Sequence, residues 1–296
     1  MSQVQYLTTA EAADYLRLKE RKLYELVAEG AIPCTKVTGK WLFPRAALDS
    51  WLAAGMLTPP GFTAAVPPPI VGGSHDLLLE WLVRESGCGL ALLAEGSARG
   101  LERLAAGEVQ IAAVHFHDAD ERVEPNVARV LAESALGDAV VIGFARREQG
   151  LVVPPGNPAG IASVPDAVAK GLRFAVRQKG AGAQLLLEAL VARGGLDAAQ
   201  VAIAGAPAPT GSELALAVRT GRADCGVAPR GVADSFGLHF LPLVWERFDL
   251  VVRRRTFFEP GAQALFARMR DPSFAARAAD LGGYDVAEAG RVLLNR

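Results

Sequence analysis

Residues 7–52, LTTAEAADYLRLKERKLYELVAEGAIPCTKVTGKWLFPRAALDSWL, decide the fold of the N-terminal part of this chain. Thr8 followed three residues later by Glu11 predicts a capping box, and therefore a helix that continues through Leu16. A second helix is predicted over residues 19–29, where apolar residues recur at helical spacing. Both helices are short, so they need further elements to bury their apolar faces.

A hairpin and a third helix supply those elements. Two strand-like segments flank Thr38-Gly39-Lys40, a turn that places a glycine where a positive φ is easiest. The third helix is predicted to start at Pro44, a favoured first-turn residue, and to bury Leu48, Trp51 and Leu52. Two short helices, a β-wing and a third helix predict a winged helix-turn-helix domain over residues 1–56.

The order of these residues resembles a known family of DNA-binding domains. The pattern Leu-Thr-x-x-Glu-Ala-Ala, Leu-Tyr-x-Leu, Gly-x-Ile-Pro and Trp-x-Phe, ending in Leu-x-x-Trp-Leu, is similar to the excisionase-like branch of the family that includes MerR-type regulators. The resemblance implies that the second helix enters the major groove of double-stranded DNA.

Candidate DNA-binding residues follow from that arrangement. On the second helix they are Lys19, Arg21, Lys22 and Tyr24. On and beyond the wing, where they would reach phosphates, they are Lys36, Lys40 and Arg45. The alternative is that these are solvated charges on a small protein–protein module.

The charge balance puts a limit on the DNA interaction. The whole chain has a net charge of −1, and residues 1–56 hold seven Lys and Arg against six Asp and Glu. No global basic field is present, so affinity would depend on a few well-placed cations and on paired half-sites. We therefore expect a homodimer.

Proline marks the end of the first domain. Residues 57–69, LTPPGFTAAVPPP, hold five of the eighteen prolines, which fix φ and remove backbone donors. We interpret this segment as a semi-stiff linker. It separates the first domain from a second domain over residues 70–296.

In the second domain strand-like and helix-like segments alternate, which predicts parallel α/β layers. The predicted strands are residues 69–71, 110–115, 139–145, 151–153, 172–176, 225–228 and 249–253. The predicted helices are residues 76–84, 98–106, 183–193 and 212–220.

Several strand-to-helix junctions carry small or hydroxylated residues. They are Gly73-Ser74-His75, Gly96-Ser97 and Gly180-Ala181-Gly182. Helix N-termini offer unpaired N–H groups and the positive end of the helix dipole. Three such junctions at the carboxyl ends of strands in one open sheet predict an anion site.

This domain resembles periplasmic-binding-protein-like domains, relatives of exported molybdate- and tungstate-binding proteins. The similarity lies in GSHD (73–76), GS (96–97), RREQGL (146–151), GNP (156–158), RQ (177–178), GRAD (221–224), ERFDLV (246–251) and LGGYD (281–285). It implies a bilobal type 2 fold, with lobe one over about 70–145 plus 246–296 and lobe two over about 146–245. The fold class is thus α/β, with the winged helix-turn-helix domain first.

The resemblance implies that ligand binds in the cleft between the lobes. The candidate ligand-binding residues are Ser74, His75, Ser97, His115, Arg177, Ala181, Gly182, Thr210 and Glu246. The sequence departs from the family pattern at residues 180–184, where GAGAQ replaces Gly-Ser-Gly-Thr-Arg, and at Gly211 and Phe248. A molybdate or tungstate effector is expected, and a less charged ligand or an empty scaffold are the alternatives.

Other functions find little support in the sequence. His115 and His117 could form a metal pair, but no further ligand cluster accompanies them, so we expect no metal and no cofactor. No P-loop, Gly-x-Ser-x-Gly or His-Glu-x-x-His motif predicts an enzyme.

The location of the protein is a further expectation. Three widely spaced cysteines, no export signal and no apolar run of about 20 residues predict a cytoplasmic protein without a membrane segment. The leading hypothesis is a cytoplasmic transcriptional regulator that senses an oxyanion. The alternative is a DNA-architectural or partner-binding protein with a ligand-free second domain.

Overall fold

A computed structural model describes residues 6–37, 39–55, 66–117 and 124–296. The chain divides into two compact units, with the boundary between Ala65 and Val66. Most of the predicted linker, residues 57–65, lies outside the described residues. Within the described ranges no helix is long and apolar enough to span a membrane.

The N-terminal unit has the predicted winged arrangement. Its elements are β1 (Tyr6–Leu7), α1 (Thr9–Tyr15), α2 (Glu20–Ala28), β2 (Thr35–Val37), β3 (Lys40–Pro44) and α3 (Arg45–Ala54). The strands form a sheet in the order β1-β3-β2. Thr8 and Glu11 form the capping box, in which Thr8 N donates to Glu11 Oε2 over 2.8 Å. Leu23, Phe43 and Leu48 are fully buried at the centre of this unit.

Two details of the third helix differ from the prediction. Pro44 is the last residue of β3, and the helix begins one residue later at Arg45. The predicted burial of Leu52 is wrong, since its exposed fraction is 46%. The inward positions of α3 are Leu48 and the half-buried Trp51, whose Nε1 donates to the carbonyl of Ala31 over 2.8 Å.

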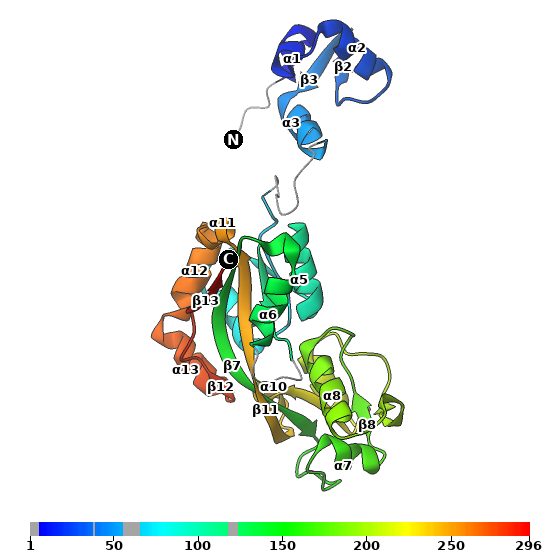
Figure 1. The fold of residues 1–296 in the computed structure, drawn as a ribbon, viewed down its shortest axis with the longest axis vertical. Coiled ribbons are helices and arrows are strands. Elements are labelled where there is room, and N and C mark those ends of the chain that lie inside the picture. Colours follow the sequence, from blue (N-terminus) through cyan, green and yellow to red (C-terminus); the bar gives the residue numbers. More distant parts are fainter. Residues whose placement is uncertain (1–5, 38, 56–65, 118–123) are drawn as a thin grey trace. The chain divides into compact units, whose positions relative to one another are not determined.

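The second unit, residues 66–296, is called the body domain below. Two long antiparallel strands, β7 (Ala139–Val153) and β11 (His239–Arg253), run side by side through its length (Figure 1). The sequence predicted two short strands in place of β7 and only the last third of β11. The error arises because polar residues, among them Arg147 and Gln149, interrupt the apolar run while remaining buried.

Parallel strands flank this central pair. The sheet order is β5-β4-β6-β11-β7-β10-β8-β9, and β12 (Tyr284–Asp285) and β13 (Val292–Asn295) pair with β7. The flanking strands are β4 (Ile70–Gly73), β5 (Ala91–Ala94), β6 (Ile111–Val114), β8 (Arg173–Ala175), β9 (Ala202–Ile203) and β10 (Cys225–Pro229). The predicted parallel layers therefore hold for the flanks, whereas the centre is antiparallel.

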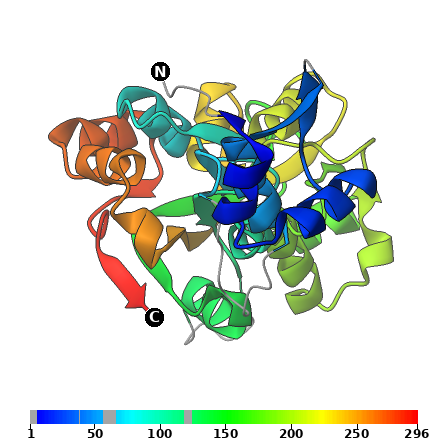
Figure 2. The same cartoon turned by 90° about the horizontal axis from the view of Figure 1, so that it is seen from above.

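The body domain has two lobes joined by β7 and β11. Lobe one carries α4 (Leu77–Glu85), α5 (Ser97–Ala106), α6 (Pro125–Ala132), α11 (Arg254–Phe257), α12 (Pro260–Met269) and α13 (Pro272–Leu281). Lobe two carries α7 (Val164–Ala169), α8 (Gly182–Arg193), α9 (Gly211–Arg219) and α10 (Arg230–Ser235). In Figure 2 the orange helices α12 and α13 stand on the side of the body domain opposite the yellow-green lobe two.

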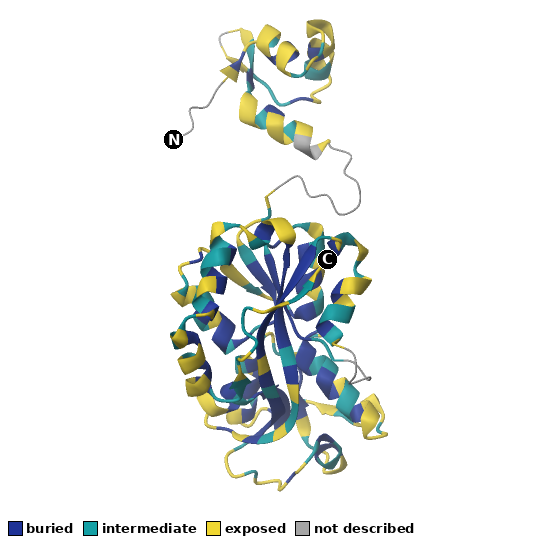
Figure 3. Cartoon of the chain, turned by 60° about the vertical axis from the view of Figure 1, so that its left-hand side comes forward, coloured by how far each residue is buried: buried dark blue, intermediate teal, exposed yellow. Residues whose placement is uncertain are grey.

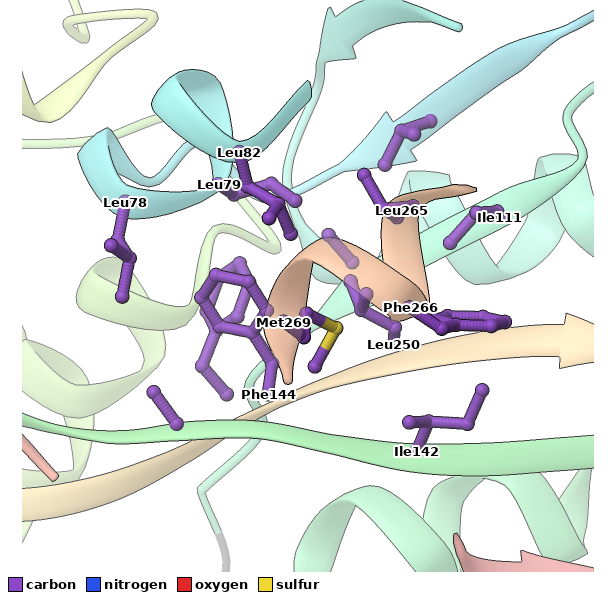
Figure 4. Close-up of a cluster of buried hydrophobic side chains, with 14 of the residues drawn as sticks. Leu78, Leu79, Leu82, Ile111, Ile142, Phe144, Leu250, Leu265, Phe266 and Met269 are labelled. Carbon is purple, nitrogen blue, oxygen red and sulfur yellow. The ribbon is translucent and has the colours of Figure 1, made fainter. Parts of the chain in front are cut away.

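Each lobe has its own apolar core. Figure 3 shows the strands largely buried and the outward faces of the helices exposed. In lobe one, Phe144 and Leu250 of the central strands pack with Leu79, Leu265 and Phe266 from the covering helices (Figure 4). In lobe two, a separate cluster collects residues of α7, α8 and β10.

Candidate functional site

The cleft is built at the starts of helices from both lobes. Ser74 follows β4, and Ser97 is the first residue of α5. Their hydroxyl oxygens lie 2.7 Å apart, and both side chains are buried. Gly96, which precedes α5, has a φ of +92°, so a glycine is favoured at this turn.

The two hydroxyls are engaged within the protein. Ser97 Oγ accepts from the backbone N–H of His115 and donates to the carbonyl of His115, each over 3.0 Å. A hydroxyl has one proton and two lone pairs, so one lone pair of Ser97 Oγ remains, and it accepts the hydroxyl proton of Ser74. The predicted ligand-binding roles of Ser74 and Ser97 therefore compete with bonds that fix the end of β6.

His115 brings lobe one against lobe two. A Cβ placed on Gly182 at the start of α8 would lie 1.9 Å from the Cδ2 and Nε2 atoms of the His115 ring. Nε2 is buried without a hydrogen-bond partner and lies 3.9 Å from Glu246 Oε1. Burial lowers the pKa of His115 well below its ordinary value, so the ring is neutral at pH 7. The absence of a side chain at Gly182 is what allows this contact.

The N-terminus of α8 offers two backbone donors. Ala181 N donates to Gln178 O, but the N–H groups of Gly182 and Ala183 find no acceptor among the described residues. Ala181, Gly182 and Ala183 are all buried. Buried unpaired N–H groups at the positive end of a 12-residue helix favour an anionic or carbonyl partner.

Arg177 is the cation beside these donors. Its Nε donates to Ala208 O over 2.9 Å and its Nη2 to Pro209 O over 2.7 Å. Burial, together with the positive charge of Arg147, lowers its pKa to about 10. The guanidinium is still charged at pH 7, and its Nη1 has no acceptor among the described residues.

Thr210 and His75 have local partners. Thr210 is the N-cap of α9, and its hydroxyl accepts from the backbone N–H of Glu213 over 3.1 Å. The cleft is instead lined by the adjacent Gly211. His75 lines the cleft as well, and its Nε2 lies 3.4 Å from Glu80 Oε2.

A buried ionic network forms the floor of the cleft. Arg147 donates through Nη1 to Asp76 Oδ2 over 2.8 Å and through Nε to Glu246 Oε1 over 2.5 Å. Gln149 Nε2 donates to the same Glu246 oxygen over 2.8 Å. The predicted ligand residue Glu246 is thus committed to groups of the protein. Although burial alone would raise the pKa of Glu246, its interactions with Arg147 and His117 hold it well below its ordinary value.

Three members of this network were absent from the predicted site: Asp76, Arg147 and Gln149. Asp76 also caps α4, since its Oδ1 accepts from the backbone N–H groups of Leu78 and Leu79. The signal for the other two was their spacing of two residues inside the polar run 146–149, which separates two apolar runs. Such spacing places both side chains on one face of the sheet.

The space between these groups is small. Within the cleft cavity, the centre of a water molecule can occupy a volume of about 10 Å³. The cavity is lined by Ser74, His75, His115, Arg147, Arg177 and Ala181. That volume holds about one water molecule. A larger ligand therefore needs His115 to rotate or the lobes to separate.

The predicted metal pair is placed near Glu246. His115 and His117 have ring centroids 6.3 Å apart, and His117 Nε2 lies 2.7 Å from Glu246 Oε2. In the ranges that the structure covers, no group of three His, Cys, Asp or Glu side chains is arranged to hold a metal ion.

A second candidate interface lies on the N-terminal unit. Arg21, Lys22 and Tyr24 are exposed on α2, and Lys19 is its exposed N-cap. Glu25 lies 3.4 Å from Arg21 Nε and 3.3 Å from Lys22 Nζ. One carboxylate therefore partly offsets the two cations that the sequence assigns to the major groove.

The wing residues are exposed too. Lys36 on β2 lies with its Nζ 5.2 Å from the centroid of the Trp41 ring, and Lys40 begins β3. Arg45 at the start of α3 lies over the ring of Tyr15, 5.1 Å from its centroid. All of the predicted DNA-contacting residues are exposed, so each is accessible to a partner.

Comparison with known families bears on both units. Residues 80–270 match the family described as the PBP superfamily domain. Residues 6–56 match the family described as a helix-turn-helix domain. The second match covers all the elements of the N-terminal unit.

One sequence relative and one solved structure are similar to much of this chain. The uncharacterized protein YvgK of Bacillus subtilis (strain 168) is 23% identical over 311 residues, covering 99% of this chain and 99% of the relative. The structure of the tungstate ABC transporter from Geobacter sulfurreducens is 20% identical, with a TM-score of 0.50, and covers 71% of this chain and 98% of that chain. At 20% identity this structural similarity concerns the fold.

Proposed function

The chain belongs to the PBP superfamily and carries an N-terminal helix-turn-helix domain, and we propose on this basis that it regulates transcription in response to a small anion. It is a DNA-binding regulator with a ligand-binding domain. The observation that carries the anion proposal is the start of α8, where two buried, unpaired N–H groups lie near Arg177. These donors match an oxyanion or carboxylate.

The charges of the protein groups around the cleft cavity nearly cancel. Arg147 and Arg177 are balanced by Asp76 and Glu246, so the protein groups around the cavity are close to neutral in sum. Molybdate or tungstate is the leading candidate, supported by the resemblance of this domain to oxyanion-binding proteins. The departures at residues 180–184 reduce the number of donors that such an ion would meet.

The ligand would act through the arrangement of the lobes. A ligand changes DNA affinity only if it binds one lobe arrangement more tightly than another. In this proposal the protein acts in the cytoplasm as a homodimer on paired half-sites, with α2 in the major groove.

Calorimetric titration of the full chain with molybdate, tungstate, sulfate and phosphate tests the ligand. We expect saturable binding of at least one ion, and a loss of at least tenfold in affinity with Arg177→Ala. Arg173→Ala is the matched control, since Arg173 pairs with Asp224 on the exposed face of lobe two. No heat and no shift of the melting temperature with any ion would remove the anion from the proposal.

A gel shift on the promoter of its own gene tests DNA binding. The double variant Arg21→Ala/Lys22→Ala should weaken binding by at least tenfold, whereas Arg219→Ala/Arg222→Ala in the body domain should not. Equal binding by wild type and by the α2 variant would refute the assignment of the recognition helix.

A second function is favoured by the packed cleft. Because the cavity holds about one water and the serine hydroxyls are bonded internally, the body domain would also suit a ligand-free scaffold that binds a partner. DNA affinity that no small anion alters would favour this alternative.

A further inference from the structure

A second and larger cavity lies between the lobes. Its volume is about 700 Å³, and its walls include Phe116 of lobe one, Ala189 of lobe two, and Leu243, Trp245 and Arg146 of the connecting strands. We call it the outer groove. Helices α6 and α8 contribute Pro125 and Ala189 to its walls. Cavities of this size suit a small organic ligand.

Trp245 gives the outer groove an aromatic surface. It lies on β11, and its exposed fraction is 47%. An indole exposes a large apolar face that water solvates poorly, and such faces stack well on planar rings. Phe116, Leu243 and Val244 extend the apolar lining on both sides of the lobe junction.

Among the described residues that line the groove there are three arginines, of which Arg193 and Arg247 already have interactions, and this leaves Arg146 for a ligand. Arg247 lies within 3.4 Å of carboxylate oxygens of Glu124, Asp249 and Glu288. Glu246 is already held by Arg147, Gln149 and His117. Arg146 is exposed and forms no ion pair with any described residue. Its guanidinium fork is a strong partner for a carboxylate.

We propose that the outer groove binds a planar aromatic carboxylate, with its ring against Trp245 and its carboxylate on Arg146. This site is distinct from the cleft cavity beside Arg177, which we call the inner cavity. The bond between His117 and Glu246 lies between the two sites, and Glu246 in turn contacts Arg147 of the inner cavity. Because its walls come from both lobes, an occupant would bias the lobe arrangement, and this bias would couple it to an inner anion.

Fluorescence and calorimetric titrations of the full chain test this proposal, with benzoate, 1-naphthoate and indole-3-acetate as probes. Cyclohexanecarboxylate and benzyl alcohol are the controls that lack the ring or the charge. We expect at least one aromatic acid to bind at millimolar concentration or below, at least tenfold more tightly than either control. Trp245→Leu and Arg146→Gln should each weaken binding by at least tenfold, and Arg146→Lys should weaken it less than Arg146→Gln.

Matched variants separate this site from the rest of the surface. Phe258→Leu removes another exposed aromatic ring, and Arg222→Gln another exposed arginine; both should leave the affinity unchanged. Molybdate bound in the inner cavity should change this affinity only up to a limit and should not displace the acid. No binding of the three acids, equal binding by Trp245→Leu or Arg146→Gln in a folded variant, or competition by molybdate would overturn the proposal.

Discussion

At the scale of single residues, Gly182 decides how closely the lobes approach. The backbone of α8 meets the ring and the carbonyl of His115, and a Cβ would lie 2.5 Å from that carbonyl oxygen. The backbone of His115 cannot move aside as a side chain can, so the strain caused by an added Cβ would be distributed between the two lobes.

Gly182→Ala should therefore lower the free energy of unfolding of the body domain by about 1–3 kcal/mol. Urea denaturation measures the change. In a protein that already carries His115→Ala, the change Gly182→Ala should lower the free energy of unfolding by less, because the His115 ring is absent. Some loss should remain, because the His115 carbonyl is still present. Gly137→Ala, where a Cβ meets nothing within 4 Å, is the control and should be nearly neutral. Equal effects at the two glycines would contradict the proposed contact.

His115 makes the stability depend on pH. Burial lowers its pKa below the ordinary value of 6.5, so below pH 6.5 the unfolded chain binds a proton that the folded chain excludes. Stability should then fall with acidification, by up to about 1.4 kcal/mol per pH unit, until the folded-state pKa is reached.

His115→Asn should reduce the slope between pH 6.5 and 5 by up to that amount, as urea unfolding at a series of pH values would measure. His239→Asn changes an exposed histidine on β11 and serves as the control. A slope unchanged by His115→Asn would show that the ring is not buried as a neutral group.

At the scale of elements, α2 carries its own counter-charge. Glu25 contacts Arg21 and Lys22, and all three side chains are at least 45% exposed. Exposed pairs of this kind contribute little to stability. Glu25 has a larger effect on the electrostatic potential at a bound phosphate, because its negative charge lies close to both cations.

Glu25→Gln should therefore raise DNA affinity about three- to tenfold at low salt, because each charge near the backbone changes binding by a similar factor. Fluorescence anisotropy with promoter DNA at several salt concentrations measures this. Glu29→Gln makes the same charge change at the C-cap of α2 and should have a smaller effect. Weaker binding by Glu25→Gln would show that the pairing orders the recognition residues.

At the scale of the whole molecule, the two compact units have separate cores. Separate cores predict separate unfolding transitions. In calorimetry, Thr8→Ala should remove the capping box of α1 and destabilise the N-terminal unit by about 1 kcal/mol, lowering one transition while leaving the other unchanged. A single transition that shifts as a whole would show that the units unfold together.

The sequence alone determined the N-terminal domain almost completely, because its signals are local. A capping box, a turn glycine and helical periodicity act over a few residues, and α1, α2 and the wing lie where they indicate. Leu52 was misassigned because helical spacing cannot say which neighbour covers a position.

In the body domain the sequence located the helix starts that surround the cleft but not the long strands or the ionic floor. From the sequence alone, Arg147 is expected to be a solvated strand residue. Asp76 and Glu246 are 71 and 99 residues away in the sequence, and only the pairing of β7 with β11 brings them to its guanidinium. The contact of Gly182 with His115 and the outer groove beside Trp245 likewise need both lobes in place. Local sequence signals specify helices, strands and turns, whereas burial and electrostatic contacts between residues distant in the sequence exist only in the folded chain.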